Sequence, residues 1–450
     1  MKFYFFLISL FFFSCETEPK THVILSGVVS SDVADSLLLK TDNRYRFYRQ
    51  PEISRSIGLN EDGTFSDTIE LSEGNYELQA EGTTTKLFFK PGYALHIDLT
   101  KDAIVISGKG QKENEYIQER VSLTEKIRPY NYWKYFSTLP EEKFLKYADS
   151  LEALHLDLLS KHEQLDERLQ KAEANWARVQ KAHKFINYSF TREMNAPNYD
   201  PSENYPDPLA GLEVNDEDIL DVSFFPMVML LYNGPRADEK EIDQWQYILS
   251  EGYPVSNPEV KEEVLYRTAK YTMADFQELD DFYVEAKPVI RDKVKWTEIT
   301  EKYNELQQLK NGKPAPGFQL QNMKGEAISL EELKGNIVYL DFWASWCRPC
   351  IDEIPYFKKL QDEFEQENVK FVSIGIDSKK ENLQKLIDMH QLGGIHLFET
   401  DKEDMLKRKY AIEGIPRYVL IDREGNIVEK DAARPSNPLL AEQIKSLLKI

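Results

Sequence analysis

Two cysteines, Cys347 and Cys350, are separated by two residues and closely follow a run with the pattern of a buried strand, Ile337 to Trp343. This placement predicts that the C-x-x-C motif opens a helix. At a helix N-terminus, unpaired backbone N–H groups and the positive end of the helix dipole stabilise an anion. They lower the pKa of a thiol, and the thiolate is the nucleophile of disulfide exchange. We therefore expect Cys347 to be an exposed attacking thiol and Cys350, one turn further along, to be the resolving thiol.

Two other uses of a C-x-x-C motif compete with this interpretation. A zinc site requires two further ligands, and no histidine has a spacing that supplies them: His22, His96, His155, His162, His183, His390 and His396. A purely structural disulfide is possible in an oxidising compartment. It would give no common reason for Trp346, Pro349 and the Gly414-Ile415-Pro416 loop. We therefore favour redox chemistry and expect neither a metal nor a cofactor.

Three motifs follow one another along the last third of the chain. They are KPAPGF at Lys313 to Phe318, FWASWCRPC at Phe342 to Cys350, and Gly-Ile-Pro at 414–416 ahead of a strand-like run. With these motifs, residues 311–450 resemble the thioredoxin superfamily, and within it the TlpA/ResA-like thiol–disulfide oxidoreductases. The resemblance implies a thioredoxin-like α/β fold for this part of the chain.

The same resemblance implies which residues meet a substrate. Cys347 and Cys350 would form the redox disulfide, and Pro416 would be a cis proline that faces them. Trp346, Ile415 and Pro416 are therefore the expected substrate-binding residues. The substrates that the family implies are protein thiols and disulfides.

Two carboxylates are placed to move a proton at the dithiol. Asp341 matches the buried aspartate of thioredoxins, and Glu353, three residues after Cys350, matches the active-site glutamate of ResA-like proteins. A desolvated carboxyl has a raised pKa and can accept the proton of a resolving thiol. We expect Asp341 to be the main base and Glu353 to tune thiol pKa and partner choice. The alternatives are a strand-end capping role for Asp341 and a solvated helix position for Glu353.

Two arginines near the motifs bear on potential and partner choice. Arg348, between the cysteines, would stabilise a thiolate and so make the couple more oxidising, whereas the carboxylates act in the opposite direction. Arg417 follows Pro416. We expect it to be a solvated edge residue rather than a contact for an acidic partner.

Composition limits the number of domains and the classes of partner and scaffold. The chain has 450 residues, of which 41% are hydrophobic, so about three domains with real cores are expected. A net charge of −21 repels phosphate backbones and makes nucleic acid an improbable partner. Three cysteines exclude a disulfide-stapled scaffold and a four-cysteine zinc site.

Residues 1–15 have the pattern of a lipoprotein-type signal peptide. Lys2 precedes an apolar run from Phe3 to Phe13, too short for a membrane span, which needs about 20 residues. Ser14-Cys15 then resembles a bacterial lipobox, although Phe12 stands where that pattern usually has leucine. We expect lipidation at Cys15 and a membrane attachment through it. An ordinary cleaved signal with an incidental cysteine is the alternative.

The rest of the chain divides by its patterns. Short strand-like runs separated by turns in residues 16–108 predict a β-sandwich-like domain, loosely similar to the β-domain ahead of redox domains in Bacteroidetes-type envelope proteins. Residues 109–310 are predicted to be helical, with apolar positions from Leu151 to Phe190 on one face of a single long helix. In residues 311–450, alternating runs predict a mixed sheet covered by helices on both faces.

These expectations describe an exported envelope thiol–disulfide oxidoreductase. By resemblance the usual direction is reduction of substrate disulfides, with electrons from a membrane thiol reductant. A thiol peroxidase shares the fold, but its signature has threonine where Ala344 stands. The other alternative is a lipid-anchored binding module, formed by the first three hundred residues, to which the redox domain is accessory.

Overall fold

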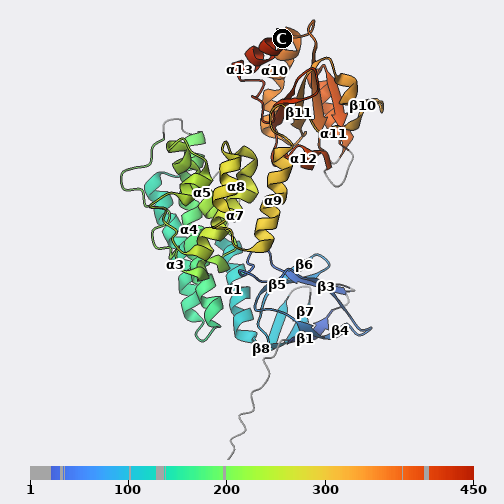
Figure 1. Ribbon diagram of the computed structural model, residues 1–450. Coiled ribbons are helices and arrows are strands. Elements are labelled where there is room, and N and C mark those ends of the chain that lie inside the picture. The colour runs from blue at the N-terminus through green and yellow to red at the C-terminus, as the bar shows by residue number, and fades with distance from the viewer. Residues whose placement is uncertain are drawn as a thin grey trace, which may run out of the picture. The chain divides into compact units, whose positions relative to one another are not determined.

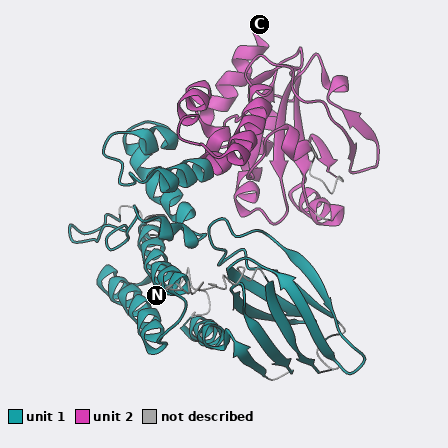
Figure 2. Cartoon of the chain, turned by 60° about the horizontal axis from the view of Figure 1, so that its bottom comes forward, with its two compact units in different colours: residues 1–268 teal, residues 269–450 magenta. Residues whose placement is uncertain are grey.

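The computed structural model describes residues 22–30, 34, 36–100, 103–127, 136, 138–195, 199–377, 379–399 and 405–449 (Figure 1). The predicted signal peptide and Cys15 lie outside these residues. The chain forms two compact units, Met1–Thr268 and Ala269–Ile450 (Figure 2).

The first unit begins with two four-stranded sheets that enclose a common core. One sheet has the order β4-β1-β7-β8, and the other has the order β3-β2-β5-β6. Strands β1 and β7 are parallel, and the other neighbouring pairs are antiparallel. Alternate residues of β1 (Val23, Leu25 and Val29) are buried, as period-two alternation in a half-buried strand requires. The strands are β1 (His22–Val29), β2 (Ser36–Thr41), β3 (Ser54–Gly58), β4 (Thr64–Glu70), β5 (Gly74–Ala80), β6 (Thr83–Phe89), β7 (Ala94–Leu99) and β8 (Ile104–Lys109).

Helices follow these sheets in the first unit. Residues from α1 and from the start of α4 complete the core of the sheets: Tyr116, Ile117, Leu165, Leu169 and Ala172. The helices are α1 (Gln111–Ile127), α3 (Glu141–Lys161), α4 (Glu167–Asn195), η1 (Glu217–Asp221), α5 (Phe225–Glu239), α6 (Gln244–Leu249) and α7 (Pro258–Thr272), the last of which ends in the second unit.

The prediction of a single long helix from Leu151 to Phe190 is wrong. The chain turns between α3 and α4, where Gln164 has a left-handed φ of 63°. The Asp166 carboxylate then accepts the backbone N–H groups of Arg168 and Leu169 at 3.0 and 3.1 Å, which caps the start of α4. Apolar residues keep a helical spacing across this turn, so the sequence pattern concealed the break.

The second unit contains a seven-stranded sheet of order β10-β9-β13-β12-β11-β14-β15. Strands β11, β12 and β13 are parallel neighbours, whereas β14, β15, β9 and β10 pair antiparallel. The mixed sheet agrees with the predicted one. Its strands are β9 (Gln319–Asn322), β10 (Ala327–Ser329), β11 (Ile337–Trp343), β12 (Val369–Gly375), β13 (Ile395–Phe398), β14 (Arg417–Ile421) and β15 (Ile427–Glu429).

Helices cover both faces of this sheet. Ile337 and Tyr339 of β11 pack with α10 and α13, whereas Leu340 and Phe342 pack with residues at α12. The helices of the unit are η2 (Met273–Asp275), α8 (Leu279–Ala286), α9 (Lys293–Gln307), η3 (Glu331–Leu333), α10 (Arg348–Glu363), α11 (Lys380–His390), α12 (Met405–Lys409) and α13 (Pro438–Leu448). Because alternate residues of a strand point to opposite faces, Asp341 lies on the α10 face with Ile337 and Tyr339.

Candidate active site

The C-x-x-C motif lies where β11 ends and α10 begins. Cys347 is the N-cap residue of α10, and its Sγ accepts the Cys350 backbone N–H at 3.2 Å. The two sulfurs are bonded, and the Cα atoms lie 5.3 Å apart. Pro349 in the first turn needs no N–H donor there. The helix N-terminus therefore presents its positive end to the sulfurs, as the sequence predicts.

Exposure does not separate the two cysteines in this disulfide form. Cys347 and Cys350 are each 5% exposed, so the expectation of an exposed Cys347 is wrong for the oxidised chain. The residues beside them are open to solvent: Trp346 is 68% exposed, and the Arg348 side chain is 81% exposed. The two cysteines differ in position rather than in exposure: Cys347 caps α10, whereas Cys350 borders a pocket.

The loop ahead of Cys347 is held by a carboxylate from the next strand connection. Asp377, which is 4% exposed, accepts the backbone N–H of Ser345 at 2.7 Å and also accepts the Ser345 hydroxyl. The Trp343 carbonyl accepts the Ile376 N–H at 3.0 Å. These bonds fix the chain direction just before the cysteines. Sequence reasoning missed Asp377, because it becomes adjacent only when β12 pairs with β11.

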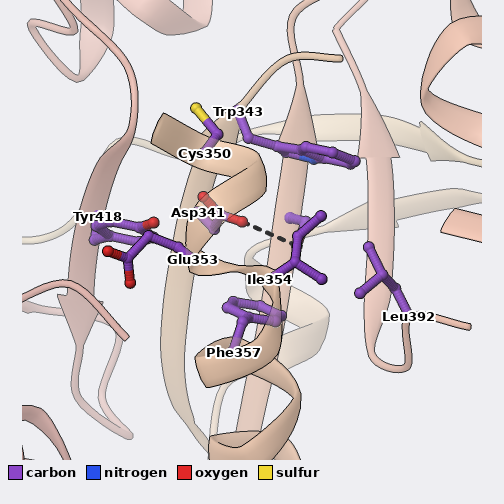
Figure 3. A pocket seen from close by; sticks show the side chains of 9 residues that line it. Asp341, Trp343, Cys350, Glu353, Ile354, Phe357, Leu392 and Tyr418 are labelled. Carbon is purple, nitrogen blue, oxygen red and sulfur yellow. Dashed lines mark hydrogen bonds between the residues drawn. The ribbon is translucent and has the colours of Figure 1, made fainter. Parts of the chain in front are cut away.

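A narrow pocket extends from Cys350 between α10 and the sheet (Figure 3). On the sheet side, Ser373 of β12 and Tyr418 of β14 are the register partners of Asp341. On the helix side, spacings of three, four and seven residues place side chains on one face of α10. The residues that line the pocket are Asp341, Trp343, Cys350, Glu353, Ile354, Phe357, Ser373, Leu392 and Tyr418.

Asp341 is the most perturbed acid of this pocket. The pKa of its carboxyl is raised to about 7: burial is the main cause, a hydrogen bond from Ser373 opposes the shift, and the charge of Glu353 adds to it. That bond is long, with 3.4 Å between Ser373 Oγ and Asp341 Oδ2. The enclosed Oδ1 has no hydrogen-bond partner among the described residues. Asp341 therefore has both the pKa and the free acceptor atom of a base that works near neutral pH.

Glu353 is buried and tied to a second loop. It is 8% exposed, so the alternative of a solvated helix position is wrong. Its Oε2 accepts the Ser436 backbone N–H, and its Oε1 accepts the Ser436 hydroxyl, both at 2.9 Å. Glu353 thus joins α10 to the loop ahead of α13, and two of its acceptor positions are already occupied. Asp341 Oδ1, by contrast, has no hydrogen-bond partner among the described residues.

The Gly414-Ile415-Pro416 loop has the conformation that the resemblance implied, with a cis bond between Ile415 and Pro416. Ile415 packs against the cluster that contains both cysteines. The expectation of a solvated Arg417 is wrong. Its side chain is 13% exposed and lies 3.2 Å from Asp275 and 2.9 Å from Asp431.

Ser373, Tyr418 and Ser436 also escaped the sequence analysis. Strand alternation alone places a side chain on a face, but only the pairing of β12 and β14 with β11 brings Ser373 and Tyr418 beside Asp341. Among the described residues, no group of three or more histidine, cysteine, aspartate or glutamate side chains could hold a metal ion. No described helix is long and apolar enough to cross a bilayer.

Known proteins resemble the second unit. The Redoxin family model matches residues 310–444. The thiol–disulfide oxidoreductase ResA of Bacillus cereus is 28% identical over 146 residues, which cover 32% of this chain and 79% of that relative. ResA of Halalkalibacterium halodurans is 31% identical over 118 residues, 26% of this chain and 66% of that relative. The crystal structure of the thioredoxin domain of a thiol–disulfide oxidoreductase from Bacteroides vulgatus is 27% identical over 31% of this chain and 99% of that one, with a TM-score of 0.29.

The family match and the Cys347–Cys350 disulfide at the start of α10 define an oxidoreductase of the thioredoxin-like, Redoxin type. Through this domain the chain belongs to the TlpA/ResA-like thiol–disulfide oxidoreductases of the thioredoxin superfamily.

Proposed function

We propose that this chain reduces disulfides of protein substrates in a bacterial cell envelope through the dithiol form of Cys347 and Cys350. One observation carries the proposal: Cys350 and Asp341 line the same pocket, and the pKa of Asp341 is raised to about 7. A structural disulfide would need no proton acceptor there. A dithiol that must release a proton from its inner thiol does need one.

The reaction balances as two thiol–disulfide exchanges. The Cys347 thiolate, stabilised at the N-terminus of α10, attacks one sulfur of the substrate disulfide, and the other substrate sulfur leaves as a thiolate. Asp341 accepts the proton of Cys350. The Cys350 thiolate then attacks Cys347 Sγ, which forms the Cys347–Cys350 disulfide and releases the second substrate thiolate. The substrate gains two electrons, and the dithiol loses them.

A protein substrate would be held beside Pro416. The structure records no hydrogen bond from the backbone of Gly414 or Ile415 to the described residues, so these groups are available to an extended substrate chain. The exposed Trp346 supplies apolar surface next to Cys347. Trp346, Ile415 and Pro416 are therefore the substrate-binding residues of the proposal.

The cellular setting rests on the N-terminal pattern and on the resemblance. A signal peptide at 1–15 would export the chain, and a lipid on Cys15 would attach it to a membrane. A membrane thiol reductant would return two electrons to the Cys347–Cys350 disulfide. The β-domain at 16–108 and the helical region at 109–310 would then lie between the attachment and the redox domain at 311–450.

Single-cysteine variants test the proposed roles. In an insulin reduction assay on the full chain, Cys347→Ser should abolish activity. Cys350→Ser should retain the attack but accumulate mixed disulfides with substrate, detectable on non-reducing gels. Retained activity in Cys347→Ser would refute the assignment, and mixed disulfides trapped by Cys347→Ser but not by Cys350→Ser would reverse the two roles.

The direction of electron flow is tested by the reduction potential of the disulfide, measured by equilibration against glutathione or dithiothreitol with thiol alkylation. A potential near −270 mV, as in thioredoxin, supports a reductase. A value near −120 mV would mean that Arg348 outweighs the carboxylates and that the chain oxidises its partners.

A further inference from the structure

The residues that flank the Gly414-Ile415-Pro416 loop both pair with the helical segment that precedes the redox fold. Glu413, one residue before the loop, forms an ion pair with Lys302 of α9. Arg417, one residue after it, pairs with Asp275 of η2 at 3.2 Å. We call residues 273–307, from η2 to the end of α9, the preceding segment. Both ends of the loop are thus held from outside the region that matches Redoxin.

The cation of each of these ion pairs is largely shielded from solvent. The side chains of Arg417 and Lys302 are 13% and 20% exposed. A backbone contact adds to them: Lys430, next to β15, donates to the Ala274 carbonyl at 2.6 Å. Lys302 also donates to the Lys270 carbonyl of α7, which fixes Lys302 itself. The acidic partners of the two cations, Asp275 and Glu413, are 56% and 33% exposed, so each pair joins a shielded cation to a more open carboxylate. Partly buried pairs are screened by salt less than fully exposed ones.

The preceding segment lies at the end of the sheet where the chemistry occurs. Arg417, the first residue of β14, pairs with Phe342, near the end of β11 that leads to Cys347. The Arg417 side chain donates to Asp275 at 3.2 Å. A substrate chain that pairs with the open backbone of Ile415 therefore approaches residues of the preceding segment as well as the disulfide.

We infer that the preceding segment selects protein substrates by fixing the cis-proline loop and by bordering the surface on which an extended chain docks. The inference rests on the proposed function and deepens it. Lys302 and Asp275 are positioning residues: they act through Glu413 and Arg417 and touch neither sulfur. A small disulfide needs only the sulfurs, whereas a protein disulfide also needs the loop backbone in place.

The test compares two substrates on the full-length chain. KM and kcat are measured for insulin and for glutathione disulfide in Lys302→Met, with Lys310→Met as the matched control. Lys310 also forms an ion pair, with Asp280 at 2.7 Å, but that pair does not involve the loop. We expect Lys302→Met to raise the KM for insulin about tenfold relative to the KM for glutathione disulfide, and Lys310→Met to leave this ratio unchanged.

A charge swap distinguishes a positioning role of Lys302 from a general loss of structure in the variant. The double variant Lys302→Glu/Glu413→Lys restores the pair in reverse and should recover the insulin KM. Equal losses on both substrates, or an insulin KM that Lys302→Met does not change, would overturn the inference while leaving the proposed function intact. The proposed function fails separately, if Cys347→Ser remains active on both substrates.

Discussion

Glu173 in the first unit and Asp341 in the second are carboxylates whose pKa is raised by burial, but their surroundings differ in one respect. Glu173 in α4 is 5% exposed and lies 3.2 Å from Arg120 of α1, while the Tyr116 hydroxyl donates to it at 2.9 Å. Asp341 in β11 receives one long hydrogen bond, and its Oδ1 has no partner among the described residues. Burial raises the pKa of both carboxyls, but only Glu173 has a cation that opposes the shift.

This difference separates a structural charge from a reactive one. Arg120 is itself 1% exposed, and its guanidinium lies 4.1 Å from the ring centroid of Tyr45. Both members of the ion pair are therefore shielded from solvent. Such a pair specifies packing between α1, α4 and the loop after β2. Asp341 lacks a cation partner but borders a pocket and a redox sulfur. A perturbed carboxylate is informative about function when it is unpaired and reachable.

The largest effect is expected when the paired cluster is broken. Arg120→Met leaves the Glu173 charge buried without its cation, which should lower the free energy of unfolding by about 3–5 kcal/mol. Denaturant unfolding of the full chain measures this loss. The double variant Arg120→Met/Glu173→Leu should recover most of it, because no charge remains buried. Insulin reduction per folded molecule should not change, and a selective loss of activity would contradict the structural role.

Asp341→Asn should raise the free energy of unfolding, whereas Arg120→Met should lower it. The folded pKa of about 7 exceeds the unfolded value of 3.8, so the folded chain retains a proton that the unfolded chain releases between these values. Stability is therefore lost as the pH rises through this window. The advantage of Asp341→Asn over the parent should grow by about 3 kcal/mol between pH 5 and pH 8. Unfolding curves at both pH values check this, and a pH-independent difference would refute the raised pKa.

The same substitution should slow catalysis. Without a base for Cys350, resolution of the mixed disulfide at pH 7 should fall about 100-fold. In the parent, the rate of this step should rise with pH through about 7, where Asp341 ionises. The variant should lose this limb. Stopped-flow measurement of substrate release over pH 5–9 distinguishes the outcomes, and an unchanged limb in Asp341→Asn would transfer the role to another group.

The smallest effect is expected at an exposed carboxylate on α10. Asp352 lies 3.0 Å from Arg348, and both side chains are more than half exposed. Asp352→Asn should change the free energy of unfolding by less than about 1 kcal/mol. It is thus the matched control for Asp341→Asn. A large change in the free energy of unfolding for Asp352→Asn would contradict this comparison. It would mean that burial and missing partners do not explain why Asp341 differs from an exposed acid.

Much of the redox site was predictable because its signals are local. The apolar run at 337–343 and the C-x-x-C spacing predicted a strand that leads into a helix, and β11 and α10 follow that pattern. The cis bond at Pro416 came from the family resemblance. The long helix across 151–190 failed because periodicity records which residues are apolar, not where the backbone reverses.

The sequence alone determined which residues could exchange electrons, since residue type and C-x-x-C spacing are properties of the chain, and the family resemblance singled out Asp341. Only the tertiary structure decided which carboxylates lack partners. Pairing of β12 and β14 with β11 placed Ser373 and Tyr418 beside Asp341, and packing of α10 tied Glu353 to Ser436. A pKa depends on burial and on neighbouring charges, and both arise from contacts between residues distant in sequence.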